Sequence, residues 1–320
     1  MRAGSVPGLV VFVVLAAGCG GGGSAHPAPD DAGSKHDSGD GHDGAGGDAA
    51  AADAASIDDS SSPIDGESPD GAASSRCVIT ATDATCQHLS TTMAGRPVAY
   101  EAPVGVSPAG GWPAVIYFQG SFVPGTDAFA AMSSATFGQY DLTLTVAALL
   151  ADGYVVIAPD ASSDGTTYWE TNIPPYADSW AGSPDDMLVK ALLSSISAGT
   201  FGPINPARLY AMGISSGGFM TSRMAVSYAG TFRALADHSG SYATCSNTCT
   251  VPTPLPSGHP PTLFLHGDTD TVVPMSAIQP YLDALMAEGF ETQLVTDATA
   301  GHQWLSEAVQ AIPAWFDSHP

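Results

Sequence analysis

The sequence predicts an α/β domain with a mainly parallel central sheet and helices on both faces. Several short apolar runs rich in Val, Ile and Tyr alternate with helical segments, and continuous apolar runs are typical of parallel strands that are buried on both faces. The segment 209–220 (LYAMGISSGGFM) combines a strand, a glycine-rich corner and a helix start. Residues 76–320 are numerous enough to form one large core.

The expected elements follow one another in the alternating order of such a domain. In the helix expected at 184–197, Asp185 and Asp186 occupy the first turn, where the helix dipole favours anions. Ligands of open parallel sheets bind at the carboxyl ends of the strands, so a site is expected there. Strands are expected at 113–118, 154–158, 208–212, 234–238, 262–266 and 292–295, and helices at 142–151, 184–197 and 304–316.

The first eighteen residues predict a signal peptide. Arg2 precedes the apolar run 9–17 and small residues up to Cys19, and this run is shorter than the roughly 20 residues of a membrane span. The segment 15–19 (LAAGC) resembles the lipobox of bacterial lipoproteins, although Leu15 lies one residue further from Cys19 than usual. The resemblance implies a cell-envelope protein that is lipid-anchored at Cys19, in the outer membrane if the source has one. Ordinary cleavage after Gly18, giving a secreted protein, is the alternative.

Residues 19–75 predict a disordered linker. They are rich in Gly, Ala, Ser and Asp and hold twelve of the thirty-two acidic residues, while almost no side chain in them is large enough to form a core. They therefore carry much of the net charge of −24. With only eight Lys and Arg in the chain, nucleic acid and strongly anionic substrates are not expected as partners.

The five cysteines predict disulfides. Setting Cys19 aside leaves an even number, and an exported protein can oxidise them. Neighbours in sequence are expected to pair, although four cysteines allow three connectivities. The spacing lacks C-x-x-C and nearby histidines, so no metal is expected, and no cofactor is expected either. The predicted disulfides join Cys77 to Cys86 and Cys245 to Cys249.

The corner at 213–217 matches G-x-S-x-G and predicts a nucleophilic serine. Gly213, Gly217 and Gly218 leave room for a sharp, strained turn that exposes Ser215 at the end of the sheet. The next backbone N–H, that of Ser216, lies at a helix N-terminus and can stabilise an oxyanion. The alternative is a Gly/Ser helix entry without chemistry.

Three further segments resemble an α/β-hydrolase. They are 151–160 (ADGYVVIAPD), similar to a strand of that fold and its exit, 266–274 (HGDTDTVVP), similar to H-G-x-x-D-x-x-V-P, and 301–304 (GHQW), similar to G-H-x-W. From about Pro97 to the C-terminus the chain resembles serine esterases of this superfamily, with serine, acid and histidine in the family's order. It is most similar to extracellular medium-chain-length polyhydroxyalkanoate depolymerases, and also resembles polyhydroxybutyrate depolymerases and feruloyl-esterase-like enzymes.

The resemblance implies a triad of Ser215, Asp270 and His302. Asp268 is the alternative acid, and His238, His259 and His266 are alternative bases. The oxyanion hole is expected to combine the Ser216 amide with that of Gly120 or Ser121. Gln119 stands where relatives often have histidine.

The long loop after the second strand, 160–186, is rich in aromatic residues in an otherwise polar stretch. Such a loop forms either a minor core or an apolar wall for an acyl chain or polymer. The wall is the prediction here. Its residues are Tyr168, Trp169, Tyr176 and Trp180.

These expectations combine into an exported serine esterase without a cofactor, acting through an acyl-enzyme on polyhydroxyalkanoate or its oligomers. Its partners are the ester or polyester and, through the lipid anchor, a membrane. The alternatives are a feruloyl or acetyl esterase on polysaccharide, a serine peptidase, and a non-catalytic surface binding lipoprotein.

Overall fold

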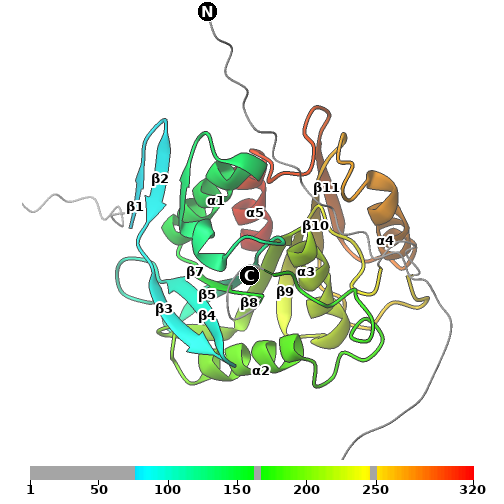
Figure 1. The fold of residues 1–320 in the computed structure, drawn as a ribbon. Helices are drawn as coiled ribbons and strands as arrows, with labels where there is room; N and C mark the ends of the chain where they lie inside the picture. The colour runs from blue at the N-terminus through cyan, green and yellow to red at the C-terminus, as the bar shows by residue number, and fades with distance from the viewer. Residues whose placement is uncertain (1–75, 162–166, 246–250) are drawn as a thin grey trace, which may run out of the picture. The chain divides into compact units, whose positions relative to one another are not determined.

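The computed structural model describes residues 76–161, 167–245 and 251–320. An eight-stranded sheet runs through this part of the chain in the order β11-β10-β9-β8-β5-β7-β4-β3 (Figure 1). Strands β5, β7, β8, β9, β10 and β11 pair in parallel, whereas β3 and β4 add an antiparallel edge. The large sheet consists of β3 (Leu89–Met93), β4 (Arg96–Glu101), β5 (Trp112–Phe118), β7 (Val155–Pro159), β8 (Ile204–Ile214), β9 (Phe232–His238), β10 (Thr262–Gly267) and β11 (Thr292–Asp297).

The predicted parallel α/β architecture is confirmed, and the central strands show why the sequence indicated it. Every residue of β7 and β10 is buried, as expected for strands covered on both faces. Strand β11, at the edge, has a mixed pattern of exposed and half-buried residues. The antiparallel edge strands were not among the predicted elements.

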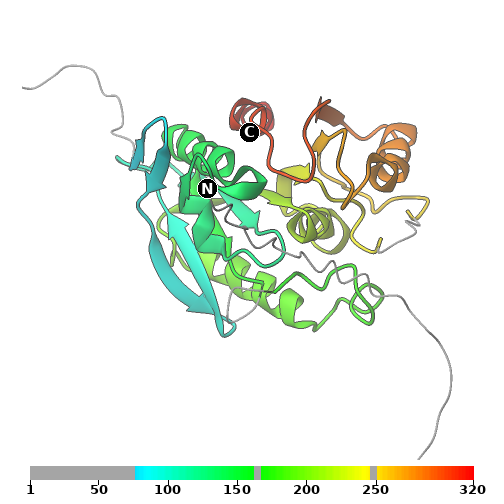
Figure 2. The same cartoon turned by 45° about the horizontal axis from the view of Figure 1, so that its top comes forward.

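Helices cover both faces of the sheet (Figure 2). Helices α1 and α5 pack on one face with residues such as Val115 and Val156, and α2 and α3 pack on the other with Ile116 and Ile157. Helix α4 packs beside α3 against Phe264 of β10. The helices are α1 (Gln139–Ala151), α2 (Pro184–Ser197), α3 (Ser216–Ser227), α4 (Met275–Ala287) and α5 (Ala308–Asp317), with short 3-10 turns η1 (Gly125–Phe129) and η2 (Thr136–Gly138).

Helix α2 begins where its sequence indicates. The Ser183 side chain accepts a hydrogen bond from the Asp186 N–H at 3.0 Å, and Pro184 occupies the first turn, which is the usual capping arrangement. The last helix was predicted to begin at Trp304, but α5 begins at Ala308. Trp304 instead lies in the loop before it, where its N–H donates to Phe137 O at 2.9 Å.

A second, three-stranded antiparallel sheet lies at the start of the described residues. It joins β1 (Cys77–Ile79), β2 (Asp83–Cys86) and β6 (Ala130–Met132). Its first two strands are linked by the Cys77–Cys86 disulfide, which confirms one predicted pair. Cys245 is also disulfide-bonded, whereas Cys249 lies outside the described residues.

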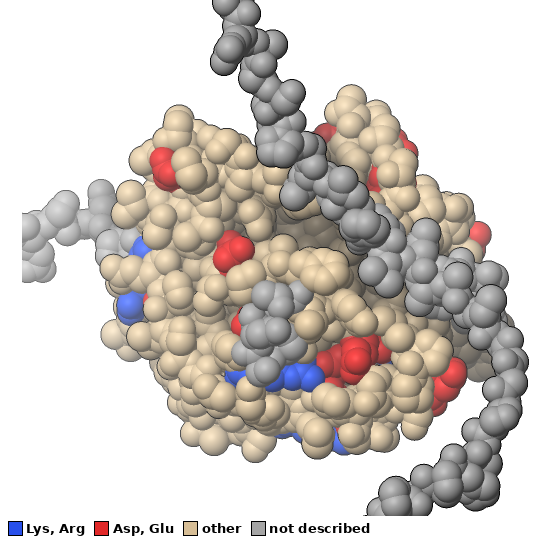
Figure 3. Space-filling view, in the orientation of Figure 1, with Lys and Arg blue, Asp and Glu red and all other residues tan. Residues whose placement is uncertain are grey.

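The signal peptide, Cys19 and the linker of residues 19–75 also lie outside the described residues. None of the helices in the described part of the chain is long and apolar enough to cross a membrane. On the face shown in Figure 3 most described surface is uncharged and basic side chains occupy small patches, in keeping with the few basic residues of the sequence.

Candidate active site

The serine corner, residues 213–218, joins the end of β8 to α3. Ser215 has φ 59° and ψ −123°, a backbone conformation that side chains rarely adopt and that stores strain. The turn is held by a hydrogen bond from Ser215 N–H to His238 O at 3.0 Å. Ser215 is half-buried and lies at the carboxyl end of the strand.

The glycines of the serine corner are required by close backbone contacts. A Cβ on Gly217 would lie 2.0 Å from Phe118 O, and one on Gly213 would lie 2.4 Å from Gly217 O. A Cβ on Gly218 would lie 2.6 Å from the buried Asp237 carboxylate. A side chain at Gly213 or Gly217 would push the corner away from the end of β5, and one at Gly218 would collide with the end of β9, which explains the pattern in the sequence.

Asp270 and His302 form the acid–histidine pair expected from the sequence. His302 Nδ1 lies 2.7 Å from Asp270 Oδ2, while Asp270 Oδ1 accepts from the N–H groups of Val272 and Val273 at 2.8 and 2.9 Å. Burial raises the pKa of Asp270, but the hydrogen bonds from His302 and the two amides outweigh it and lower the pKa below its ordinary value. The alternative acid, Asp268, is exposed.

The sheet brings Ser215 and His302 to the same edge. Ile214 of β8 is paired with His238 of β9, which is paired with Leu265 of β10, and the His302 loop follows β11. No hydrogen bond joins the Ser215 hydroxyl to His302, both of which are described. Such bonds in ligand-free enzymes often form only when substrate binds.

His238, an alternative base in the sequence, instead connects the two loops. Its carbonyl accepts from Ser215, its Nε2 accepts from Leu305 N–H at 2.9 Å, and its ring stacks on Trp304 with centroids 4.9 Å apart. Burial, with His266 and His302 nearby, lowers its pKa to about 3. A neutral, fully buried ring with an occupied Nε2 positions the loops and is unsuited to act as the base.

The two other alternative bases are also buried and engaged. His266 Nε2 donates to Val273 O at 2.7 Å, and burial lowers its pKa. His259 Nε2 bonds to the Tyr281 hydroxyl, and burial lowers the His259 pKa to about 4. Both stabilise the loops around β10, and His302 alone among these histidines pairs closely with Asp270.

The turn after β5 lies against the start of α3. Ser121 Oγ donates to Ser216 Oγ at 3.1 Å, and neither of these residues' amide N–H groups donates to an acceptor in the described part of the chain. Burial and Asp127 raise the pKa of Tyr117, while the Gly120 N–H acts in the opposite sense. The amides of Ser121 and Ser216 remain candidate donors, with that of Gly120 as the alternative to Ser121.

Gln119 was not assigned a contact from the sequence. Its side chain is fully buried, and neither its Oε1 nor its Nε2 has a hydrogen-bond partner. Its backbone carbonyl accepts from the Trp169 indole at 3.0 Å. Gln119 thus ties the turn to the aromatic loop through its backbone.

The aromatic loop, residues 167–183, corrects the predicted substrate wall. Trp169 is fully buried and packs edge-to-face on Phe118 at 5.2 Å, and Trp180 is 8% exposed. Both belong to the core beneath α2 and α3, because their large apolar rings fill space between the loop and the sheet. Tyr176 is half-buried. Of these four aromatic residues Tyr168 is the most exposed, at 40%, and its ring lies edge-to-face with the exposed Phe122.

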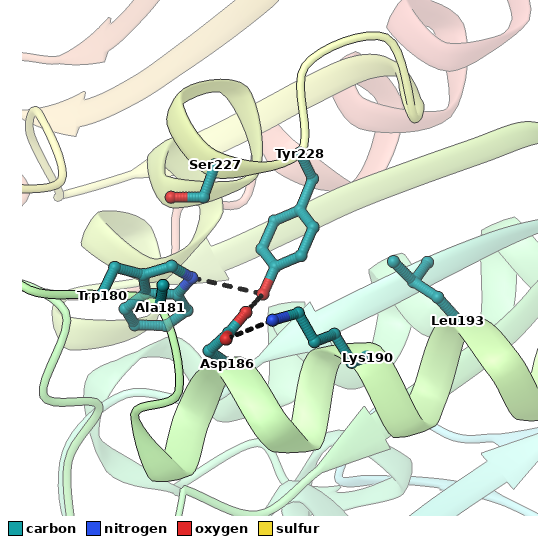
Figure 4. Close-up of a pocket in the computed structure, with 7 residues that line it drawn as sticks. All are labelled: Trp180, Ala181, Asp186, Lys190, Leu193, Ser227 and Tyr228. Atoms are coloured by element: carbon teal, nitrogen blue, oxygen red, sulfur yellow. Dashed lines mark hydrogen bonds and ion pairs between the residues drawn. The ribbon is translucent and has the colours of Figure 1, made fainter.

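Trp180 borders a pocket at the far end of α3 from Ser215 (Figure 4). Its indole N–H donates to the Tyr228 hydroxyl, which donates to Asp186 Oδ1, and Asp186 Oδ2 accepts from Lys190. These four side chains therefore link the aromatic loop to α2 and to the end of α3.

A second pocket, of about 500 Å³, lies beside His302. No sequence motif indicates this pocket, because its other residues come mostly from a segment without one. It is lined by Ser133, Ala135, Thr136, Phe137, Gly138, Tyr140, Asp141, His302 and Gln303. Within the described residues, no group of three or more His, Cys, Asp or Glu is arranged to hold a metal ion.

Comparison with known proteins identifies relatives. The chain is 45% identical over 260 residues to a poly(3-hydroxyoctanoate) depolymerase of Pseudomonas fluorescens, covering 78% of this chain and 92% of the relative. It matches none of the protein-family models.

Solved structures share the fold at low identity. A thermostable esterase has a TM-score of 0.52 at 17% identity, over 72% of this chain and 62% of that one. Pyrococcus horikoshii acylaminoacyl peptidase has a TM-score of 0.51 at 12% identity, over 73% of this chain, and this chain spans 41% of the peptidase. The fold, the acid–histidine pair and the identity to the Pseudomonas enzyme agree: this chain belongs to the poly(3-hydroxyoctanoate) depolymerase family of carboxylic ester hydrolases, within the α/β-hydrolase superfamily.

Proposed function

We propose that this protein is an exported serine esterase that cleaves polyhydroxyalkanoate or its oligomers through an acyl-enzyme. The observation that carries the proposal is the strained Ser215 at the edge where Asp270 holds His302 at 2.7 Å. A nucleophile, a base and an orienting acid are the elements of acyl transfer. The substrate class comes from the relative, which is a poly(3-hydroxyoctanoate) depolymerase.

In the first half-reaction the Ser215 hydroxyl attacks the ester carbonyl carbon while His302 Nε2 takes its proton. The negative charge on the carbonyl oxygen is stabilised by the amides of Ser216 and Ser121. The carbon–oxygen bond to the alcohol then breaks, and His302 gives the proton to the departing oxygen. Asp270 keeps Nδ1 protonated, so that Nε2 is free to act.

In the second half-reaction water attacks the acyl-enzyme. His302 removes a proton from the water, a second tetrahedral intermediate forms, and the proton returns to Ser215 as the acid leaves. No group beyond the chain's own residues and water is needed to balance these steps.

The test is hydrolysis by the full-length chain of p-nitrophenyl octanoate and of a polyhydroxyoctanoate suspension. We expect Ser215→Ala to lower ester turnover by roughly 10³-fold or more, and Ser194→Ala, an exposed serine of α2, to retain it. Clearing of the suspension by the wild type identifies a depolymerase. Ester turnover without clearing would indicate an esterase of small esters, and unchanged turnover in Ser215→Ala would reject the nucleophile.

We also propose export and lipid anchoring at Cys19. The Cys77–Cys86 disulfide supports an oxidising compartment, and the segment before Cys19 supports processing there. In a bacterial host fed an alkyne fatty acid, we expect the wild type to carry the label and Cys19→Ser to lose it. An unlabelled wild type that is cleaved after Gly18 and recovered from the medium would replace anchoring by secretion.

A further inference from the structure

The pocket beside His302 is formed by two segments that press against each other. Trp304 N–H donates to Phe137 O at 2.9 Å, and a Cβ on Gly138 would lie 2.1 Å from Trp304 O. Phe137 has φ 59° and is 57% exposed, although it is a large apolar residue in a left-handed conformation. Strain of this kind persists where surrounding structure imposes it, and it often accompanies function.

The chemistry of the proposed reaction indicates which part of a substrate meets this pocket. His302 must give its proton to the departing alcohol oxygen, so that oxygen has to lie within hydrogen-bond reach of the imidazole. The surface that His302 shares with Phe137 and Gln303 is within reach of a unit attached to this oxygen. A pocket of about 500 Å³ lies within the size range of sites that hold small organic molecules.

We propose that this pocket, with Phe137 and Asp141, binds the alcohol-side unit of the polyester and selects a neutral unit over one that ends in a carboxylate. This inference rests on the function proposed above and deepens it. The enzyme then prefers ester bonds inside the polyester to the last ester bond, whose cleavage releases the hydroxy acid at the carboxylate end.

The selection against carboxylate follows from the charges around the pocket. None of the nine lining residues is Lys or Arg, and Asp141 is among them. Burial raises the pKa of Asp141, and the nearby Glu307 raises it further, so this carboxyl group already experiences a negative neighbour. A substrate carboxylate would add a second repulsion. The one lining residue that becomes positive during the reaction is His302, and its charge is already paired with Asp270.

The test compares two dimers that differ only at the alcohol-side end. Both contain 3-hydroxyoctanoyl-3-hydroxyoctanoate, one with a free carboxylate and one with that carboxyl capped as its N-methyl amide. We expect the full-length enzyme to cleave the capped dimer at least fivefold more efficiently in kcat/KM, and Asp141→Asn to reduce that ratio to less than twofold. Asp152→Asn, at the other end of α1, is the matched control and keeps the wild-type ratio.

A second variant tests the apolar part of the pocket. Phe137→Asn keeps a residue that tolerates positive φ but removes the aromatic ring. We expect the preference for an octanoate-derived over a butyrate-derived alcohol unit to fall at least threefold, while the preference among acyl chain lengths changes less.

The outcomes separate the subsite from the function. A wild-type ratio near one, an equal ratio in Asp141→Asn and Asp152→Asn, or a change in acyl-length preference alone in Phe137→Asn overturns the alcohol-side assignment, even if Ser215-dependent turnover is intact. A folded enzyme that cleaves neither dimer contradicts the proposed function, and the subsite falls with it.

Discussion

The catalytic edge, which we define as the loops around Ser215, Asp270 and His302, and the aromatic loop of residues 167–183 close the same end of the sheet by different means. The catalytic edge is fixed by backbone: glycines without room for a Cβ, a strained serine and carboxylate–amide hydrogen bonds. The aromatic loop is fixed by large side chains that enter the core. Substitutions of Ser215, Asp270 and His302 should therefore mainly change activity, whereas substitutions of the buried aromatic residues of the loop should mainly change stability.

The largest effect is expected at Asp270. Asp270→Asn keeps the shape of the side chain but loses the charge that orients His302, and the analogous change in a serine protease lowers kcat by about 10⁴-fold. Steady-state kinetics on p-nitrophenyl octanoate would measure it. Asp268→Asn, an exposed neighbour, is the control and should lose less than about threefold; equal losses in the two variants would remove Asp270 from its assigned role.

Trp169 should show the largest loss of stability. Trp169→Ala removes a fully buried ring and should lower the free energy of unfolding by about 3–5 kcal/mol. Tyr168→Ala, next to it and 40% exposed, should cost less than about 1 kcal/mol. Denaturant unfolding would decide, and similar costs for the two would mean that the loop is not anchored by its buried tryptophan.

Gly217 tests whether the backbone of the serine corner has room for a side chain. Gly217→Ala places a Cβ 2.0 Å from Phe118 O and should lower the free energy of unfolding by about 1–3 kcal/mol or more, with a loss of kcat through displacement of Ser215. At Gly120 the nearest atom to an added Cβ is 3.4 Å away, so Gly120→Ala should unfold close to the wild-type denaturant midpoint. A wild-type midpoint for Gly217→Ala would show that the corner can relax.

The residues of the catalytic edge could be predicted from the sequence because its geometry depends on the backbone. Only glycine fits at Gly213 and Gly217, and the acid and the histidine lie in the loops that follow β10 and β11, so pattern and position coincide. The Cys77–Cys86 disulfide confirms one predicted pair. Asp270 and His302 are hydrogen-bonded, and their catalytic roles stay a prediction.

The aromatic loop, the pocket beside His302 and the role of His238 depend on the direction in which side chains point. The sequence pattern does not indicate that direction. Trp169 and Tyr168 are adjacent aromatics in one loop, yet one is buried and the other is exposed. The pocket beside His302 combines the start of α1 with a loop more than 150 residues later in the chain. His238 follows a strand as a catalytic histidine could, but its burial assigns it to hydrogen bonds between loops.

His238 gives the most gradual effect, which is absent at neutral pH and grows as pH falls. The pKa of His238 in the folded protein, about 3, lies below the ordinary value. Between these two pH values the unfolded chain is protonated at His238 and the folded chain is not. The neutral ring costs nothing above pH 6.5, and it destabilises the fold progressively as pH falls from 6.5 towards 3, by up to about 1.4 kcal/mol per pH unit. His238→Asn should reduce this slope in unfolding measurements at pH 7, 6, 5 and 4. An unchanged slope would mean that His238 is protonated in the fold.

The most direct measurement of the central claim is the position of a covalent label. The full-length chain is treated with a fluorophosphonate probe, digested and mapped by mass spectrometry, alongside Ser215→Ala. The account predicts one adduct on the peptide that contains Ser215, formed in proportion to the loss of esterase activity and absent from the variant. An adduct on another residue, or ester turnover that survives in an enzyme fully labelled at Ser215, would contradict it.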